Sequence, residues 1–319
     1  MNDMLQLIHD VGIVPVIKIT DPNTAVPLAK ALDEGGIPVA EVTFRTEHAA
    51  EAIRRINREV PSVLTGAGTV TTLAQVDAAL EAGAKFIVTP GFNPKIVDYC
   101  LEKKVPIVPG APSTSDIEQA IERGLEVVKC FPAEALGGLK YIKAICGPYS
   151  GVQFMPTGGV NPANINSYLA FNRILACGGS WMIDQKLIDA GDYAGIATLC
   201  REAVDTVLGI RFAHIGLNDP NSAAAKLAAE QFAGLMGAHA ADDGNAFWPC
   251  EELEVLPKMV RGQNGHIAFW CNNMERAVYQ LTRRGYEFSM EETGKDPAGH
   301  RFLFLKGEMA GFSVHLLER

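Results

Sequence analysis

Hydrophobic and polar residues alternate in one repeated rhythm along the first two thirds of the chain. Short runs rich in β-branched residues are each followed by a longer segment with apolar residues three or four positions apart. Such a pattern is typical of strands that alternate with amphipathic helices. The predicted strands are 13–17, 39–44, 63–67, 86–89, 107–109, 126–130, 153–156 and 174–177. Eight strands with intervening helices predict a (β/α)8 barrel, or TIM barrel, over residues 1–207.

The rhythm stops near residue 207, and a second pattern with a weak internal repeat follows. Each half of this region reads as strand, helix and then three strands, with the helices at 222–236 and 274–284. A repeat of this kind indicates one supersecondary unit used twice. We therefore predict a second, smaller α+β domain over residues 208–319, built from two βαβββ halves.

Charge and cysteine content narrow the class of protein. The formal net charge is −9, and lysine and arginine are not clustered, so neither nucleic acid nor an anionic membrane is an expected partner. Seven scattered cysteines without a C-x-x-C spacing favour reduced thiols. The N-terminus lacks the pattern of a signal peptide, and no apolar run is long enough to span a membrane. We expect a cytoplasmic protein.

A lysine and a glutamate lie at unusual places in the predicted barrel. Lys129 is near the end of the sixth strand, next to Val128, and Glu41 lies inside the second strand. Catalytic residues of such barrels lie at the carboxyl ends of strands. Burial favours the neutral form of a lysine, which can attack a carbonyl carbon. The alternatives are a lysine that extends into water and an ion pair between Glu41 and Arg45.

Paired glycines follow the last two predicted strands. They are Gly158-Gly159 and Gly178-Gly179, where this fold often binds phosphate. Glycines allow backbone N–H groups to approach an anion, and the N-terminus of a following helix adds to the attraction. One glycine pair alone is more often a tight turn. Together with Lys129 and Glu41, the pairs indicate an enzyme that acts on a phosphorylated carbonyl compound.

These residues belong to motifs that resemble the class I 2-keto-3-deoxy-6-phosphogluconate (KDPG) and 4-hydroxy-2-oxoglutarate (KHG) aldolase family. The resemblance covers residues 11 to about 205. The matching motifs are Glu41-Val42-Thr43-Phe44-Arg45-Thr46, Gly66-Ala67-Gly68-Thr69-Val70, Lys129-Cys130-Phe131-Pro132-Ala133-Glu134, Pro156-Thr157-Gly158-Gly159 and Gly178-Gly179-Ser180-Trp181.

The family resemblance implies a role for each matching position. Lys129 would form the Schiff base with pyruvate or a phosphorylated 2-keto-3-deoxy sugar acid, Glu41 would be the general acid and base, and no cofactor would be needed. The implied substrate-binding residues are Arg45, Thr69, Pro90, Phe131 and Thr157, with Gly158, Gly159, Gly179 and Ser180 at the phosphate. The family also implies a homotrimer. Alternative substrates are 4-hydroxy-2-oxoglutarate and the galactonate epimer.

Four potential metal ligands lie at equivalent positions of the two halves of residues 208–319. They are His214, Glu254, His266 and His315, a donor set that suits a divalent metal. The region resembles the vicinal oxygen chelate, or glyoxalase-like, superfamily, with His315 where that family's last ligand is typically glutamate. Two alternatives stay open: this region carries a metal-dependent activity of its own, or it is a sensing or assembly module without metal.

Overall fold

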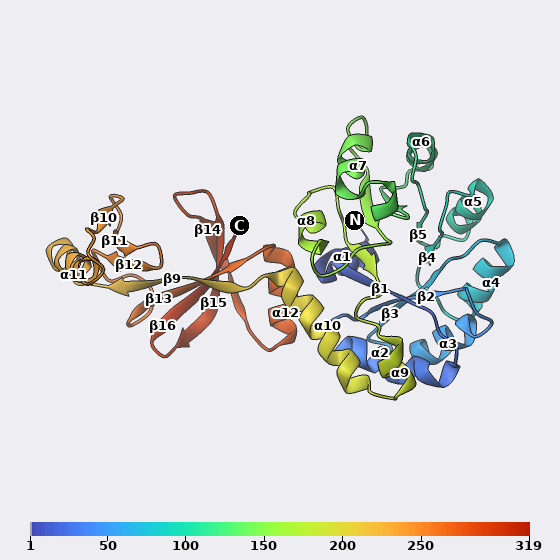
Figure 1. Cartoon of the computed structure of the whole chain (residues 1–319), viewed down its shortest axis with the longest axis horizontal. Helices are drawn as coiled ribbons and strands as arrows, with labels where there is room; N and C mark the ends of the chain where they lie inside the picture. Colours follow the sequence, from blue (N-terminus) through green and yellow to red (C-terminus); the bar gives the residue numbers. More distant parts are fainter. Residues whose placement is uncertain (1) are drawn as a thin grey trace. The chain divides into compact units, whose positions relative to one another are not determined.

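The computed structural model describes residues 2–319, which form two compact units. The first extends to Val207 and is called the N-terminal unit; the second, Leu208–Arg319, is called the C-terminal unit. Figure 1 labels their helices and strands. No helix within the described residues is long and apolar enough to cross a membrane. None of the seven cysteines forms a disulfide within the described residues.

The N-terminal unit alternates strands and helices. Its strands are β1 (Ile13–Ile17), β2 (Val39–Thr43), β3 (Leu64–Gly68), β4 (Ile87–Val88), β5 (Ile107–Val108), β6 (Val127–Cys130), β7 (Gln153–Pro156) and β8 (Cys177–Gly179). Its helices are α1 (Asp3–Val11), α2 (Ala25–Glu34), α3 (Ala49–Glu59), α4 (Leu73–Glu81), α5 (Pro94–Glu102), α6 (Thr114–Glu122), α7 (Gly138–Ile145), α8 (Ile165–Leu169), α9 (Gln185–Asp189) and α10 (Tyr193–Leu208), with short 3-10 turns η1 (Pro22–Thr24) and η2 (Glu134–Leu136).

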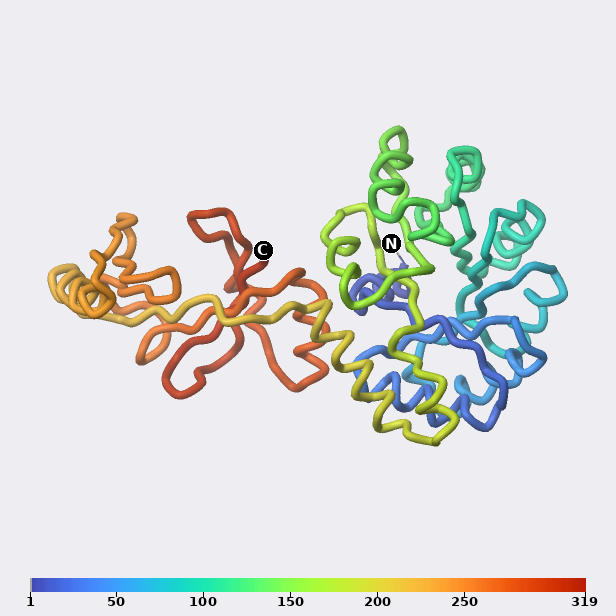
Figure 2. Tube along the Cα trace, in the orientation of Figure 1, coloured from blue at the N-terminus to red at the C-terminus, as the bar shows by residue number. Residues whose placement is uncertain are grey.

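All strand pairs of the N-terminal unit are parallel. Six strands form one sheet in the order β5-β4-β3-β2-β1-β8, and β6 pairs with β7. Isolated parallel bridges join Gly110 to Lys129 and Thr157 to Gly178. The trace in Figure 2 passes from blue through green and returns β8 to a place beside β1. The carboxyl ends of these strands therefore gather at one end of the unit.

The helices of the N-terminal unit lie around the outside of its strands (Figure 1). Helix α3 shows why, because it buries Ala49, Ala52, Ile53 and Ile56 on one face and carries charged residues on the other. Helix α6 begins at a capping box, in which Ser113 and Asp116 each accept a backbone N–H of the other. The predicted alternation of strands and helices, and with it an α/β unit, is confirmed.

The predicted eighth strand differs in position from the observed one. The apolar pattern predicts it at 174–177, whereas β8 is Cys177–Gly179. The apolar residues Ile174 and Leu175 are buried, but the ladder with β1 runs through Gly178 and Gly179, which pair with Val14 and Pro15. The apolar pattern indicates which residues are buried. It does not indicate that the hydrogen bonds of the strand extend into the glycines.

The C-terminal unit is one sheet of eight strands with two helices. The strands are β9 (Arg211–Asn218), β10 (Ala241–Asp242), β11 (Phe247–Cys250), β12 (Leu253–Leu256), β13 (Gly265–Cys271), β14 (Phe288–Lys295), β15 (Arg301–Met309) and β16 (Phe312–Glu318), and the helices are α11 (Ser222–Leu235) and α12 (Met274–Arg283). The strand order is β10-β11-β12-β9-β13-β16-β15-β14.

The two halves of this sheet repeat one arrangement. In each half the first strand pairs in parallel with the last, β9 with β12 and β13 with β16, and the halves meet where β9 and β13 pair antiparallel. Ala225 and Ala229 of α11 pack with Phe247 and Val255 to form a core of the first half. Each half therefore has the strand and helix order that the sequence predicted.

Candidate active site and candidate metal centre

Lys129 and Glu41 meet inside the N-terminal unit. They belong to β6 and β2, and Lys129 Nζ lies 3.2 Å from Glu41 Oε1. Glu41 is 0% and Lys129 5% exposed. The backbone of Lys129 is fixed on both sides, because its N–H donates to Pro109 O and its carbonyl accepts from Ala111 N–H. The two side chains are therefore held in contact by two strands rather than by a mobile loop.

A glycine makes room for the glutamate. A Cβ on Gly68, at the end of β3, would lie 2.2 Å from Glu41 Oε1, which no real contact allows. The second carboxylate oxygen, Oε2, is buried and has no hydrogen-bond partner. Burial of two charges is costly unless all their polar atoms are satisfied. An unsatisfied carboxylate oxygen next to an amine is consistent with a site that exchanges protons with a bound molecule.

The structure places Glu41 against Lys129 rather than Arg45. Arg45 directs its Nε to Thr43 Oγ1 at 3.1 Å. Lys129 does not extend into water, and its Nζ lies 5.7 Å from the centre of the Phe131 ring. Phe131 itself is 38% exposed. Both alternatives that the sequence left open for these residues thus differ from the observed geometry.

The remaining predicted binding residues lie just after the strands that carry them. Thr69 follows β3 with a positive φ of 56°, and Pro90 follows β4, where its carbonyl would lie 2.3 Å from a Cβ on Gly110. Thr157 follows β7, is nearly buried, and its Oγ1 has no hydrogen-bond partner. These positions all follow the carboxyl ends of their strands, at the end of the unit toward which β2 and β6 carry Glu41 and Lys129.

The two glycine loops are neighbours. Gly158 and Gly159 have φ values of 96° and 85°, in the left-handed region that favours glycine. The bridge between Thr157 and Gly178 brings the ends of β7 and β8 together. Ser180, which follows Gly179, is exposed. Adjacent glycine loops of this kind can direct several backbone N–H groups toward one anion.

The four predicted metal ligands of the C-terminal unit share one face of the sheet. His214 and His315 both pair with Ala268 in register, one on each side, while Glu254 and His266 both pair with Gly216. Residues that pair directly across strands point to the same face, as do residues two apart on one strand. The register therefore brings the two rows of ligands together on one face of the sheet. His214 and His315, for example, lie far apart in the sequence.

The distances within this cluster are short. The Nε2 atoms of His214 and His266 are 3.0 Å apart, and Glu254 Oε2 lies 3.1 Å from His266 Nε2 and 3.8 Å from His214 Nε2. One ring nitrogen of each histidine lies within 4.8 Å of the others. The cluster opens into a cavity of about 560 Å³ that Trp248, Trp270 and Phe304 also line.

Two histidines of the cluster, His214 and His315, are kept neutral. Burial and the neighbouring His266 and His214 lower the pKa of His315 to about 3, and burial is also the main cause that lowers the pKa of His214. His315 stacks on Phe304, with ring centres 4.7 Å apart, and both of its ring nitrogens lack a hydrogen-bond partner. Neutral imidazoles with free lone pairs and one carboxylate fit a divalent metal.

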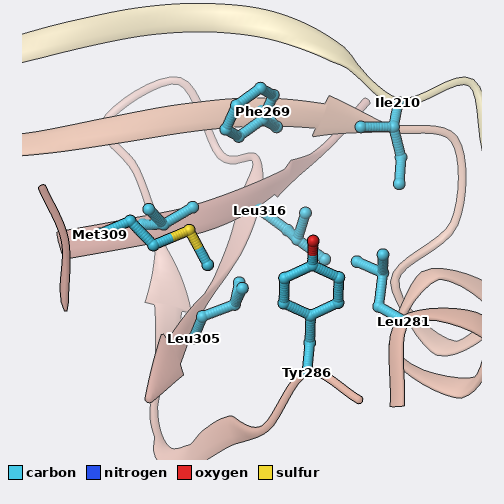
Figure 3. A pocket seen from close by; sticks show the side chains of 8 residues that line it. Ile210, Phe269, Leu281, Tyr286, Leu305, Met309 and Leu316 are labelled. Carbon is cyan, nitrogen blue, oxygen red and sulfur yellow. The ribbon is translucent and has the colours of Figure 1, made fainter. Parts of the chain in front are cut away.

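The opposite face of the same strands is apolar. Phe269 of β13 and Leu316 of β16, each next in sequence to a residue of the cluster face, line a second pocket of about 240 Å³. Figure 3 shows them with Tyr286, whose hydroxyl is the polar group among the labelled side chains. The alternation along β13 and β16 thus separates a polar cavity from an apolar pocket.

Several residues of these sites were not found from the sequence. Trp248 lies edge-on to His214, with ring centres 5.5 Å apart, and donates to Asp243. His300 binds Asp296 and lines the same cavity. In the N-terminal unit, Tyr168 binds Glu134. The sequence offered no signal for these residues, because no motif or repeat connects them with the other residues of their sites.

Comparison with known proteins covers the N-terminal unit. The family model for KDPG and KHG aldolase matches residues 5–199. The 2-dehydro-3-deoxy-phosphogluconate aldolase of Treponema pallidum is 47% identical over 207 residues, which is 65% of this chain and 99% of that protein. The KHG/KDPG aldolase of Escherichia coli K12 is 46% identical over 193 residues, which is 60% of this chain and 91% of that protein.

Solved structures give the same result. The KDPG aldolase of Legionella pneumophila, captured with pyruvate as a covalent carbinolamine intermediate, matches with a TM-score of 0.61 and 35% identity, over 63% of this chain and 98% of that one. The aldolase of Zymomonas mobilis ZM4 with 3-phosphoglycerate matches with a TM-score of 0.59 and 38% identity, over 64% and 95%. The chain belongs to the KDPG and KHG aldolase family.

Proposed function

We propose that the N-terminal unit is a (β/α)8 barrel that cleaves 2-keto-3-deoxy-6-phosphogluconate to pyruvate and glyceraldehyde 3-phosphate. The observation that carries the proposal is the buried Lys129 amine 3.2 Å from the Glu41 carboxylate. Parallel pairing and bridges that link each strand to the next support the barrel. Relatives at 41–47% identity that carry this activity in their names support the reaction.

The geometry supports a Schiff-base mechanism. Lys129 Nζ attacks the C2 ketone of the substrate, and loss of water from the carbinolamine gives an iminium ion. Glu41 removes the proton of the C4 hydroxyl, the C3–C4 bond breaks, and its electrons pass to the iminium to form an enamine. Glyceraldehyde 3-phosphate leaves. A proton returns to C3, and water releases pyruvate and restores the amine. The iminium is the electron sink, so this reaction requires no metal.

The remaining residues would position the substrate. We assign Arg45, Thr69 and Thr157 to the carboxylate and hydroxyls, with Pro90 and Phe131 beside the chain of the substrate. Gly158 and Gly159, together with Gly179 and Ser180, would bind the phosphate through their backbone N–H groups. The same site would cleave 4-hydroxy-2-oxoglutarate to pyruvate and glyoxylate. On the family resemblance we also infer a cytoplasmic homotrimer.

Borohydride trapping tests the role of Lys129. The full chain is incubated with pyruvate and sodium borohydride, and the modified peptide is mapped by mass spectrometry. We expect a reduced pyruvyl adduct on Lys129, no adduct in Lys129→Ala, and no pyruvate release from either substrate by that variant. Lys85→Ala, an exposed lysine before β4, is the control and should be labelled like the wild type. An adduct on another lysine would contradict the assignment.

A second candidate function concerns the C-terminal unit. We propose that it has a vicinal oxygen chelate-like fold and binds a divalent metal through His214, Glu254, His266 and His315. The convergent nitrogens and the carboxylate favour this. A bound metal would supply Lewis-acid chemistry to an oxygen ligand. Burial keeps the imidazoles of His214 and His315 neutral, and stacking fixes His315 against Phe304.

Metal titration of the full chain tests this second candidate. Calorimetry with Zn²⁺ should give one tight site per chain in the wild type. The site should be lost or much weakened in His315→Ala, because three ligands in place of four bind less firmly. His239→Ala is the matched control, since His239 also contacts a glutamate, Glu230, but is 94% exposed. Equal binding by both variants would locate the metal elsewhere.

A further inference from the structure

The Gly158–Gly159 loop is held by hydrogen bonds to its carbonyl groups. Gly158 O accepts from the backbone N–H of Glu134 at 3.1 Å. Gly159 O accepts from the side-chain amides of Asn161 and Asn164, at 3.0 and 3.1 Å. In a planar trans peptide the N–H points away from the carbonyl. Fixing the Gly158 carbonyl therefore also fixes the direction of the Gly159 N–H, one of the groups assigned to the phosphate.

The side chain of Glu134 continues this contact. A Cβ on Gly159 would lie 2.5 Å from Glu134 Cγ, so the glycine and the stem of the glutamate are in close contact. Glu134 is at the start of η2, and the residue taken as a whole is exposed. An exposed glutamate normally moves among many rotamers. Something must hold this one if its stem is to support the loop.

Tyr168 provides that support. It is on α8 and only 1% exposed, and its hydroxyl donates to Glu134 Oε1. The same oxygen would lie 3.0 Å from a Cβ on Gly138. Burial and the hydrogen bond to Glu134 raise the pKa of Tyr168 well above its usual range, so its hydroxyl stays protonated and continues to donate. A buried tyrosine thus fixes an exposed carboxylate beside the loop.

The charge of Glu134 gives this contact a further consequence. A carboxylate that moved freely beside an anion-binding loop would repel a phosphate. Bound to Tyr168 and next to Gly138, the carboxylate oxygen has a fixed position, and a hydrogen bond to a charged acceptor is stronger than one between neutral groups. The pair therefore both shapes the loop and restrains the negative charge.

We propose that Tyr168 and Glu134 are positioning residues for the phosphate group, and that they set the preference of the site for phosphorylated over unphosphorylated 2-keto-4-hydroxy acids. The proposal rests on the aldolase function proposed above. Neither residue touches the reacting carbon atoms. Their effect reaches the substrate only through the Gly158–Gly159 loop, so it should be absent for substrates without a phosphate.

Steady-state kinetics with two substrates tests this. For Tyr168→Phe and Glu134→Ala, KM for 2-keto-3-deoxy-6-phosphogluconate should rise about tenfold, as loss of one charged hydrogen bond allows, with kcat close to wild type. Kinetic constants for 4-hydroxy-2-oxoglutarate, and the yield of borohydride-trapped pyruvate adduct, should not change. Tyr99→Phe is the matched control, because Tyr99 also donates to a carboxylate, Asp77 Oδ1 at 2.6 Å, on another part of the unit.

A conservative variant and the possible failures complete the test. Glu134→Gln keeps the stem and an oxygen acceptor, so it should restore KM to near the wild-type value. The positioning role is overturned if Tyr168→Phe changes both substrates equally, as a general loss of stability would, or changes neither. Failure of the aldolase function has a different signature, since the wild-type chain itself would then release no pyruvate from either substrate.

Discussion

At the scale of single residues, the proposed chemistry rests on the contact between Lys129 and Glu41. A buried ion pair generally contributes little to stability, because desolvation offsets the attraction between the charges. Glu41 also keeps one oxygen without a partner, which is unfavourable for folding alone. Two groups held in this way are better explained by proton transfer to and from a bound substrate than by a structural role.

This interpretation predicts different effects on the two halves of the reaction. Glu41→Gln should lower kcat for cleavage by about 10²–10⁴-fold, the usual contribution of a positioned acid or base. The Lys129 amine remains, so the variant should still form a trapped adduct with pyruvate, although more slowly. Pyruvate release and borohydride trapping measure the two effects separately.

A surface glutamate provides the control for this prediction. Glu51 of α3 binds Arg54 and Arg55, and those contacts lower the pKa of its carboxyl. Glu51→Gln removes a paired carboxylate of the same unit without touching the site, and its kcat should equal that of the wild type. A kcat for Glu41→Gln within a few-fold of the wild type would remove Glu41 from its assigned role.

The limits of sequence reasoning are visible at this same scale. Lys129 and Glu41 could be predicted as candidate site residues, since charged residues inside apolar runs are rare. The barrel pattern also places both residues at the same end of the strands. The space that Gly68 leaves for Glu41 could not be predicted, because in a sequence a glycine that permits close packing cannot be distinguished from a glycine in a turn. The contact of Tyr168 with Glu134 joins residues 34 positions apart, with no pattern to connect them.

At the scale of elements, the periodicity of the sequence predicted the helices and strands that repeat and missed the features that do not repeat. The alternation of strands and helices is present because each helix buries one apolar face, as α3 does. The βαβββ halves were also readable, since the same order occurs twice. The start of β8 was wrong by three residues, because glycines carry the ladder there.

Register explains how the C-terminal unit assembles a cluster from scattered residues. Ala268 pairs with both His214 and His315, and a shift of one residue on either strand would turn a histidine to the apolar face. Phe269 and Leu316 line the pocket on that face. The sequence indicated the four polar positions, but only the strand order β12-β9-β13-β16 brings them together.

At the scale of the whole molecule, the chain combines two units that carry different functional groups. The N-terminal unit has an amine that can form an electron sink from the substrate itself. The C-terminal unit has a separate core and the cluster of side chains that we propose as metal ligands. If the iminium ion stabilises the electrons of the breaking bond, a metal in the other unit adds nothing to that step.

Removal of metal from the full chain should therefore leave cleavage unaffected. After treatment with a chelator, and again after addition of Zn²⁺, we expect the same kcat/KM for 2-keto-3-deoxy-6-phosphogluconate. His315→Ala and its control His239→Ala should also both match the wild type in this assay, although only the former loses metal. A rate that falls on chelation, returns with Zn²⁺ and is low in His315→Ala would have a different meaning. It would show that the C-terminal unit acts on the aldolase reaction, because the iminium chemistry of Lys129 has no step at which a metal is required.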